Sequence, residues 1–158
     1  MLNILFPIRS CVSFNGIVIF VILDNLKELR ISPEYELHGD RLFIEKEKCL
    51  YSIALPSSIE NINGKEVEIT KLTNYTIPST ATSIDNDCFS LCYKLTQLII
   101  PETFINIQRN LFSRLPELEE LTMSNEYELH GDRLFIVKDN CLESIELPKS
   151  IKKVLGRW

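Results

Sequence analysis

The chain has 158 residues, of which 45% are hydrophobic and 25% are charged, and its net charge is −5 at pH 7. This composition can fill a core and cover a surface, so it excludes a disordered chain. The acidic net charge and the scattered lysines and arginines argue against nucleic-acid binding, because phosphate contacts need clustered cations.

The N-terminal segment carries one continuous apolar run, from Ile17 to Leu23. This run is much shorter than the roughly 18 residues that span a bilayer, so the sequence predicts no transmembrane segment. It lacks the basic region and the small-residue cleavage site of a secretory signal. We therefore interpret it as a strand and turn of a first coil, with a signal peptide as the alternative.

A pattern of the form Leu-x-x-Leu-x-Leu-Pro then recurs along the whole chain at spacings of 22 to 25 residues. Its first positions, called anchors below, are Met1, Leu26, Leu50, Leu72, Leu95, Leu118 and Leu142. The apolar residues three and five places after each anchor share one face of a strand, because side chains alternate along a strand. Five units continue with a proline that ends the strand, at Pro7, Pro56, Pro78, Pro101 and Pro148. One unit cannot bury its apolar face alone, so the pattern predicts stacked coils with one short parallel strand each.

The segments between the predicted strands carry further apolar positions. Those nine and twelve places after an anchor should line the far wall of the core: Ile59 and Ile62, Ala81 and Ile84, Phe104 and Ile107, Ile151 and Val154. Phe20, Phe89 and Phe112 each lie six residues before the next anchor, where a short helical turn would direct the ring inward. The hydroxyls of Ser58, Thr80, Thr103 and Ser150 are placed to bond nearby backbone.

Two long segments of the chain are near-duplicates. Residues 34–59 and 126–151 agree at 20 of 26 positions and lie 92 residues apart (126 minus 34). In each copy a polar stretch, at 45–48 and 137–140, separates two apolar runs, which predicts a hairpin inserted into the solenoid. Gly39 and Gly131, each followed by aspartate, supply the turn that starts it.

The unit that starts at Leu72 carries a family resemblance. Its residues Leu72-x-x-Tyr75-x-Ile77-Pro78, followed by Ala81, Ile84, Phe89 and Cys92, resemble a BspA-like leucine-rich repeat. The resemblance implies an α/β solenoid, a right-handed coil with convex turns or short helices. We therefore expect a single leucine-rich-repeat domain over residues 1–158, and the absence of polar capping units suggests a piece of a longer array.

Catalytic and metal-binding motifs are missing from the sequence, so we expect no catalytic residue, no metal and no cofactor. Cys88 and Cys92 could share a metal, but without a nearby histidine they are better interpreted as buried core residues. Cys49 and Cys141 occupy the same place in two units four coils apart, too far for a disulfide between them. The duplicated His38 and His130 lack a fixed serine, cysteine or carboxylate partner beyond their own turn aspartate. The glycosylation pattern Asn74-Tyr75-Thr76 places Tyr75 in the core, which favours a chance match.

The outward face of the strands remains as the candidate binding surface, formed by residues one, two and four places after each anchor. The residues with the strongest binding potential are Glu119, Glu120, Glu143, Glu146, Thr96, Gln97 and Tyr51. The four glutamates gather in the last two units, which predicts a protein partner with a basic segment. The alternative is a solvated surface without a ligand.

The sequence therefore predicts a non-enzymatic protein-binding module. BspA-like repeats occur in cell-surface and adhesion proteins of microbes, so the resemblance implies a surface antigen or adhesin. An intracellular scaffold or regulatory protein is the alternative, favoured by cysteines that follow no disulfide framework. An enzyme using the His-Gly-Asp turns is the third possibility, and the compartment stays open.

Overall fold

The computed structural model describes residues 3–4, 11–14, 17–20, 26–103, 107, 110–123, 127–138 and 141–156, with side chains from residue 26 onward except at 138. These residues form seventeen strands and one 3-10 helix, η1 (Phe112–Arg114). The chain divides into two compact units, Met1–Ile44 with Ser52–Lys71 and Glu45–Tyr51 with Leu72–Trp158. We call these unit 1 and unit 2. The assignment of residues 1–158 to a single domain stays a prediction.

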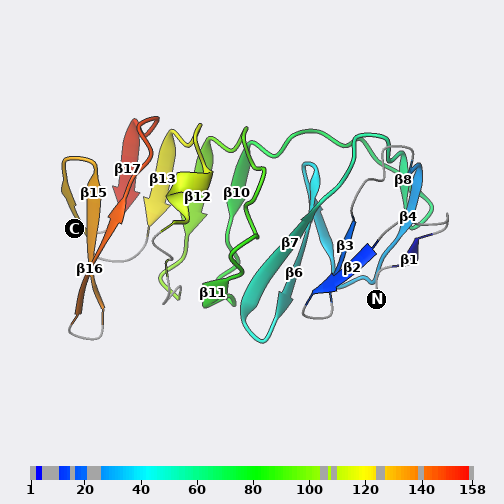
Figure 1. The fold of residues 1–158 in the computed structure, drawn as a ribbon, viewed down its shortest axis with the longest axis horizontal. Coiled ribbons are helices and arrows are strands. Elements are labelled where there is room, and N and C mark those ends of the chain that lie inside the picture. Colours follow the sequence, from blue (N-terminus) through cyan, green and yellow to red (C-terminus); the bar gives the residue numbers. More distant parts are fainter. Residues whose placement is uncertain are drawn as a thin grey trace. The chain divides into compact units, whose positions relative to one another are not determined.

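Unit 2 contains a ladder of four parallel strands that lie side by side in Figure 1: β10 (Asn74–Thr76), β12 (Gln97–Ile100), β13 (Glu120–Met123) and β17 (Lys153–Gly156). Their register places Tyr75 opposite Leu98, Leu98 opposite Leu121, and Leu121 opposite Val154. The anchors of the first three strands are all buried: Leu72, Leu95 and Leu118. The sequence pattern therefore predicted the strand and its inward face correctly in these three units.

The described residues between β10 and β12 and between β12 and β13 form turns, the short strand β11 (Ser83–Ile84) and η1, with no α-helix among them. The backbone N–H of Cys92 bonds to the carbonyl of Phe89, and that of Leu95 to Cys92; Leu115 repeats this spacing by bonding to Phe112. Each bond spans three residues, whereas an α-helix needs bonds that span four. The expected α/β class is therefore wrong for the described part of the chain, which contains strands, turns and η1. None of its helices is long and apolar enough to span a membrane.

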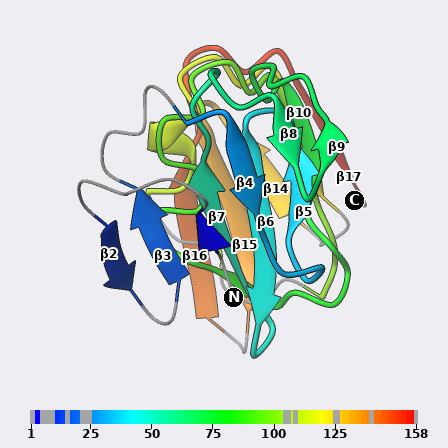
Figure 2. The same ribbon diagram turned by 90° about the vertical axis from the view of Figure 1, so that its right-hand side faces the viewer.

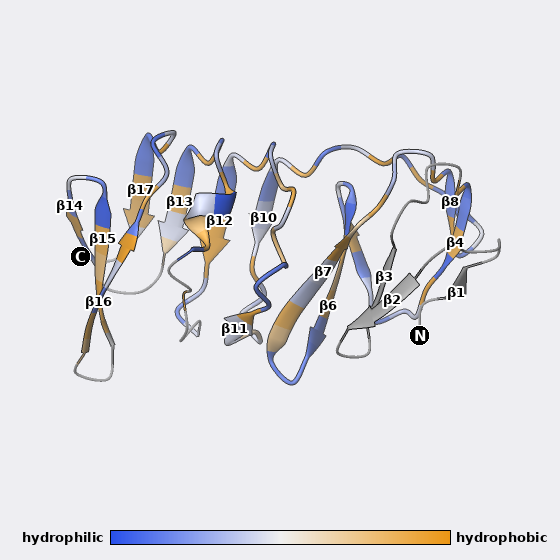
Figure 3. Cartoon of the chain, viewed as in Figure 1, coloured by the Kyte–Doolittle hydropathy of each residue, from blue (hydrophilic) through white to orange (hydrophobic). Residues whose placement is uncertain are grey.

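The core beneath the ladder contains the side chains that the far-wall pattern predicts. Ala81, Ile84 and Ile107 are buried, as are the rings of Phe89 and Phe112. Phe89 meets Tyr75 edge to face, with 5.8 Å between ring centroids, an arrangement that aromatic pairs favour. Figure 3 shows that β12 and β17 begin with hydrophilic residues and continue with hydrophobic ones.

The coils of the ladder begin in the same way each time. The N–H groups of Thr96 and Gln97 both donate to the carbonyl of Thr73, at 2.8 and 3.2 Å, and Glu119 and Glu120 both donate to Thr96, at 2.8 and 2.9 Å. Lys152 and Lys153 repeat the arrangement on Glu119, at 2.8 and 3.1 Å. By this signature the anchor of β17 is Ile151 rather than Leu142.

The expected anchor Leu142 lies in a different sheet. β14 (Tyr127–His130), β15 (Arg133–Lys138) and β16 (Cys141–Glu146) form a three-stranded antiparallel sheet, in which Leu142 is exposed. The apolar spacing predicted a strand here correctly, but it carries no information about which neighbour the strand pairs with. Val154, expected on the far wall, instead belongs to ladder strand β17.

Strand β7 (Cys49–Ala54), the counterpart of β16, has a parallel partner in unit 2. β11 (Ser83–Ile84) places Ser83 opposite Cys49 and Ile84 opposite Leu50, and Leu50 is buried. The backbone hydrogen bonds repeat the arrangement at the start of the ladder strands, because the N–H groups of Thr82 and Ser83 both donate to the carbonyl of Lys48. The first copy of the duplication is thus covered at this strand.

Unit 1 contains a second parallel pair, shown in Figure 2: β4 (Glu28–Arg30) and β8 (Asn61–Ile62), with Leu29 opposite Ile62. Ile59 is therefore the anchor of β8. Ile62, expected on the far wall, instead belongs to this parallel strand pair. β8 turns back through Asn63 and Gly64 into β9 (Lys65–Glu66). Both turn residues have positive φ, 52° and 78°, as a two-residue hairpin turn of type I′ requires.

The remaining strands of unit 1 are antiparallel. β5 (Glu36–His38) pairs with β6 (Arg41–Lys46) around Gly39, whose φ of 59° agrees with the predicted turn. β2 (Cys11–Phe14) pairs with β3 (Ile17–Phe20). β1 (Asn3–Ile4) runs antiparallel to β4, so the parallel strand expected from anchor Met1 is wrong at residues 3–4. Predictions for Met1, Phe6, Pro7 and Phe104, and for the side chain of Phe20, lie outside the described part of the chain.

The duplicated arginines test how burial changes the value of one hydrogen bond. Arg41 donates to Ser52 Oγ at 2.9 Å and only 3% of it is exposed, whereas Arg133 donates to Ser144 Oγ at 2.9 Å from an exposed position. Arg41→Ala should lower the free energy of unfolding by about 2–4 kcal/mol, because it leaves a cavity and removes a hydrogen-bond donor from the half-buried Ser52 hydroxyl. Arg133→Ala should cost less than about 1 kcal/mol. Urea denaturation of both variants measures the difference, and equal losses would contradict it.

Candidate functional site

The candidate site is the outward face of the parallel ladder in unit 2, which we call the ladder face. Its side chains form two rows that follow from the strand register. The first row is Asn74, Gln97, Glu120 and Lys153, and the second row is Thr76, Ile99, Thr122 and Leu155. All eight are exposed or half-buried, because strand alternation directs their neighbours into the core.

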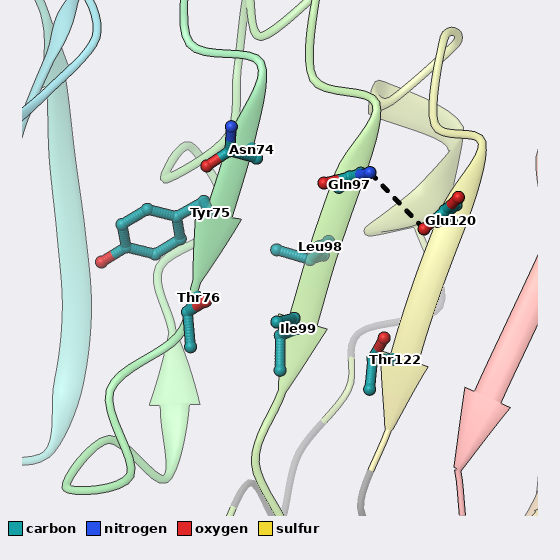
Figure 4. Close-up of a pocket in the computed structure, with 8 residues that line it drawn as sticks. All are labelled: Asn74, Tyr75, Thr76, Gln97, Leu98, Ile99, Glu120 and Thr122. Carbon is teal, nitrogen blue, oxygen red and sulfur yellow. Dashed lines mark hydrogen bonds between the residues drawn. The ribbon is translucent and has the colours of Figure 1, made fainter.

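A shallow hollow of about 150 Å³ lies on this sheet, and Figure 4 shows the residues that line it. They come from three adjacent strands: Asn74, Tyr75, Thr76, Gln97, Leu98, Ile99, Glu120 and Thr122. The Gln97 amide Nε2 donates to Glu120 Oε2 at 3.5 Å, a long hydrogen bond that a ligand could displace at little cost. The hollow thus offers amide, carboxylate and hydroxyl groups beside the aliphatic Ile99.

The charges on the ladder face are balanced rather than acidic. Glu119 Oε1 accepts from Lys152 Nζ at 2.7 Å, and Glu120 lies opposite Lys153 in the strand register. Unit 1 has the same arrangement with the signs exchanged, because Lys27 Nζ donates to Glu60 Oε1 at 2.8 Å and each residue lies 92 places before its counterpart. Both pairs are well exposed, so each adds little stability.

The predicted site residues do not form one surface. Gln97 and Glu120 lie on the ladder face, and Thr96 and Glu119 directly precede them in the chain. Glu143 and Glu146 instead belong to β16 in the antiparallel sheet, where Glu146 lies opposite Arg133. The expected cluster of four glutamates is therefore wrong, because its members come from two sheets.

Tyr51 is also separate from the ladder face. It lies half-buried on β7, and burial raises the pKa of its phenol, followed by a hydrogen bond with Cys49 and the charges of Cys49, Asp85 and Glu47. The phenol therefore stays protonated and available as a donor at neutral pH. Its position fits a structural contact within unit 2 better than ligand binding on the ladder.

Sequence reasoning missed Lys153 and Leu155, which complete the two rows. The signal for them was the pair Ile151 and Val154, an apolar anchor followed three places later by an apolar residue. The fifth place is Gly156 instead of an aliphatic residue, which is why the pattern search passed over this strand.

The duplicated histidines have carboxylate partners that the sequence analysis did not identify. His38 Nε2 lies 3.2 Å from Glu36 Oε2, and His130 Nε2 lies 3.0 Å from Glu128 Oε2. Each imidazole also meets a phenylalanine edge to face, at 5.7 Å for Phe43 and 5.4 Å for its counterpart. The carboxylates come from two residues earlier on the same strand, so each pair is a local contact on the surface.

The cysteines differ in burial. Cys88 and Cys92 are buried, as expected, while Cys141 is exposed and Cys49 is half-buried. Within the described ranges, no three His, Cys, Asp or Glu side chains lie close enough together to hold a metal ion. Tyr75, the middle residue of the glycosylation pattern Asn74-Tyr75-Thr76, is buried, in agreement with its predicted place in the core.

Parallel strands of similar length, spaced 23 residues apart at Tyr75, Leu98 and Leu121, define a leucine-rich repeat protein. Comparison with protein families agrees. Six copies of the BspA type leucine-rich repeat region match residues 38–157, and the chain belongs to this family. No curated protein and no solved structure shows significant similarity to the chain.

Proposed function

We propose that the chain is a non-enzymatic protein-interaction module that binds an extended segment of a partner protein on the ladder face. The carrying observation is that Ile99 and Leu155 remain 41% and 42% exposed within rows of hydrogen-bonding side chains. Apolar side chains surrounded by polar groups are typical of protein-binding surfaces. Membership of a leucine-rich repeat family supports the same function, since such repeats typically mediate protein interactions.

Within this function we propose a surface antigen or adhesin whose units form a right-handed solenoid. The support is the resemblance of its coils to BspA-like repeats of microbial surface proteins. The backbone entry that recurs at Lys27, Thr73, Thr96 and Glu119 also suits a regular coil. The partner would be a protein rather than a nucleic acid, because the net charge is −5 and Lys152 is already paired with Glu119.

The first test compares two substitutions at equally exposed apolar residues. Ile99→Asp changes the ladder face, whereas Leu129→Asp changes β14 at a residue that is 42% exposed. Ile99→Asp should reduce recovery of a crosslinked partner from native lysate and membrane fractions at least about tenfold, since a buried carboxylate in the interface lacks a counter-charge. Leu129→Asp should leave recovery unchanged.

The fold of both variants is checked by circular dichroism and thermal denaturation. Equal recovery with wild-type chain and Ile99→Asp would reject the ladder face as the binding site. Loss with both variants would indicate a general effect of added charge instead.

The non-enzymatic assignment is supported by the local character of the two histidine-glutamate contacts. Each histidine is solvent-exposed, and its carboxylate is two residues away on the same strand. An enzyme using these groups would lose its activity in a His38→Ala, His130→Ala variant. An activity that disappears in this variant would contradict our proposal.

An intracellular scaffold is the second candidate. The observation that favours it is that neither Cys49 nor Cys141 is in a disulfide, and exposed thiols such as Cys141 persist in reducing compartments. Protease treatment of intact cells separates the two, because a surface protein would be degraded and an intracellular one would be protected.

A further inference from the structure

The two copies of the duplicated segment differ most at the strand that ends it. Leu50 on β7 is 1% exposed, while Leu142, its counterpart on β16, is 64% exposed. Val137, which lies opposite Leu142 in the register, is 73% exposed, and Cys141 is exposed as well. We call Val137, Cys141 and Leu142 the β16 edge. Among the described strands, β16 pairs only with β15.

In the first copy of the duplicated segment, the corresponding strand β7 is covered by β11. β11 adds to β7 in parallel, with Ile84 opposite Leu50. The N–H of Asp85 donates to the Leu50 carbonyl at 2.9 Å, and Thr80 Oγ1 donates to Glu45 Oε1 at 2.9 Å. The cover therefore supplies one aliphatic side chain, backbone hydrogen bonds and a polar contact.

We propose that the β16 edge is the docking site of one further coil of the same repeat class, which adds a short parallel strand to β16 as β11 does to β7. Leu142 would receive an aliphatic residue in the place of Ile84, and its carbonyl would accept an N–H as that of Leu50 does. An open strand edge beside exposed apolar side chains is a template for such pairing.

Two differences between the copies specify the coil that fits. Glu45, which accepts from Thr80, is replaced by Val137, so the incoming coil should carry an apolar residue in the place of Thr80. Tyr51 is replaced by Glu143.

The second difference concerns charge. Asp85 follows Ile84, which lies opposite Leu50, so the same register sets Asp85 at the place opposite Tyr51, and its N–H donates to the Leu50 carbonyl at 2.9 Å. An aspartate in the same place would repel Glu143, so the incoming coil should carry lysine or arginine there. The docking site thus selects a coil with the order apolar, aliphatic, basic at the places of Thr80, Ile84 and Asp85.

The test extends the full chain by a second copy of residues 67–95, joined after Trp158 because Glu66 lies 92 places before it (158 minus 66). One version carries Thr80→Val and Asp85→Lys within the added copy, a second keeps the original residues, and a third adds Ile84→Asp to the first. Alkylation of Cys141 under native conditions is followed by site-resolved mass spectrometry. The buried Cys88 of the original segment reports that the chain remains folded.

The first version should slow alkylation of Cys141 at least about tenfold, because thiol reactivity follows access. The second should slow it less, and the third should react like the unextended chain. Cys141 reacting equally fast with the first version and without it would overturn the proposal, as would equal protection by the Ile84→Asp version. Protection that grows with the concentration of the unextended chain, with a dimer in sedimentation, would identify a second copy as the occupant and also overturn it.

Discussion

Leu50→Ala is expected to lower the free energy of unfolding by about 2–5 kcal/mol, the range measured for large-to-small substitutions in cores. Leu50 is 1% exposed and lies opposite Ile84 in the β7 and β11 pair. Truncation would leave a cavity between two strands whose backbones are fixed by hydrogen bonds, so the site cannot collapse fully. Urea denaturation gives the loss directly.

The matched control is Leu142→Ala, in the second copy of the same segment. Because Leu142 is 64% exposed, its truncation should change stability by less than about 0.5 kcal/mol. Both substitutions remove the same atoms from nearly identical sequences, so their difference isolates burial. A loss at Leu142 as large as that at Leu50 would show that the β16 edge is covered in solution.

Gly156→Ala is expected to destabilise unit 2 by about 1–3 kcal/mol, as overpacking does. A Cβ at this residue would lie 2.3 Å from the Met123 carbonyl oxygen and 2.6 Å from Tyr127 Cε1. The nearest atom belongs to the backbone of β13, which pairs with β17, so relief requires the two strands to separate. Thermal denaturation and hydrogen exchange at β17 would both report the loss.

Gly64, the residue 92 places earlier, provides the control. It has φ of 78°, and an added Cβ would meet no atom within 4 Å. Glycine is therefore favoured at this position by the positive φ alone. Gly64→Asn should lower the free energy of unfolding by well under about 1 kcal/mol, because asparagine tolerates this conformation. Gly156→Asn should cost at least as much as Gly156→Ala. An equal response of both glycines to asparagine would reject the steric explanation.

The sequence predicts the ladder well where the repeat is regular. Leu72, Leu95 and Leu118 have the expected apolar residues three and five places later, and all three units form parallel strands in register. Two rows of the outward face follow directly from this register. Spacing suffices here because the described partners of these three strands are the neighbouring strands of the same ladder.

The sequence pattern fails after the second duplicated segment for a steric reason. The ladder strand of the second copy starts at Ile151, but its fifth place is Gly156, because the ring of Tyr127 occupies the space where an aliphatic side chain would lie. Tyr127 is buried, and its hydroxyl donates to the Val154 carbonyl at 3.3 Å. A residue nearly thirty positions earlier thus takes the place of the missing apolar side chain, which no local pattern can reveal.

The candidate site was predictable only in part. Gln97 and Glu120 follow from the outward columns, but charge balance does not, because Lys152 reaches Glu119 only when Ile151 starts the strand. The supposed acidic cluster resulted from assigning Glu143 and Glu146 to the ladder. Assigning β17 instead of β16 to the ladder therefore removes Glu143 and Glu146 from the candidate site and adds Lys152 and Lys153 beside Glu119 and Glu120.

The exchanged ion pairs have a consequence for the order of the coils. Lys27 meets Glu60 in one copy, and Glu119 meets Lys152 in the other. A crossover between the two copies, in folding or in recombination, would set Lys27 against Lys152 or Glu119 against Glu60. Like charges in neighbouring strands repel, so the duplicated halves are no longer interchangeable. The sign exchange therefore favours pairing of each strand with its own neighbour over pairing with the equivalent strand of the other copy, although the two segments are nearly identical in sequence.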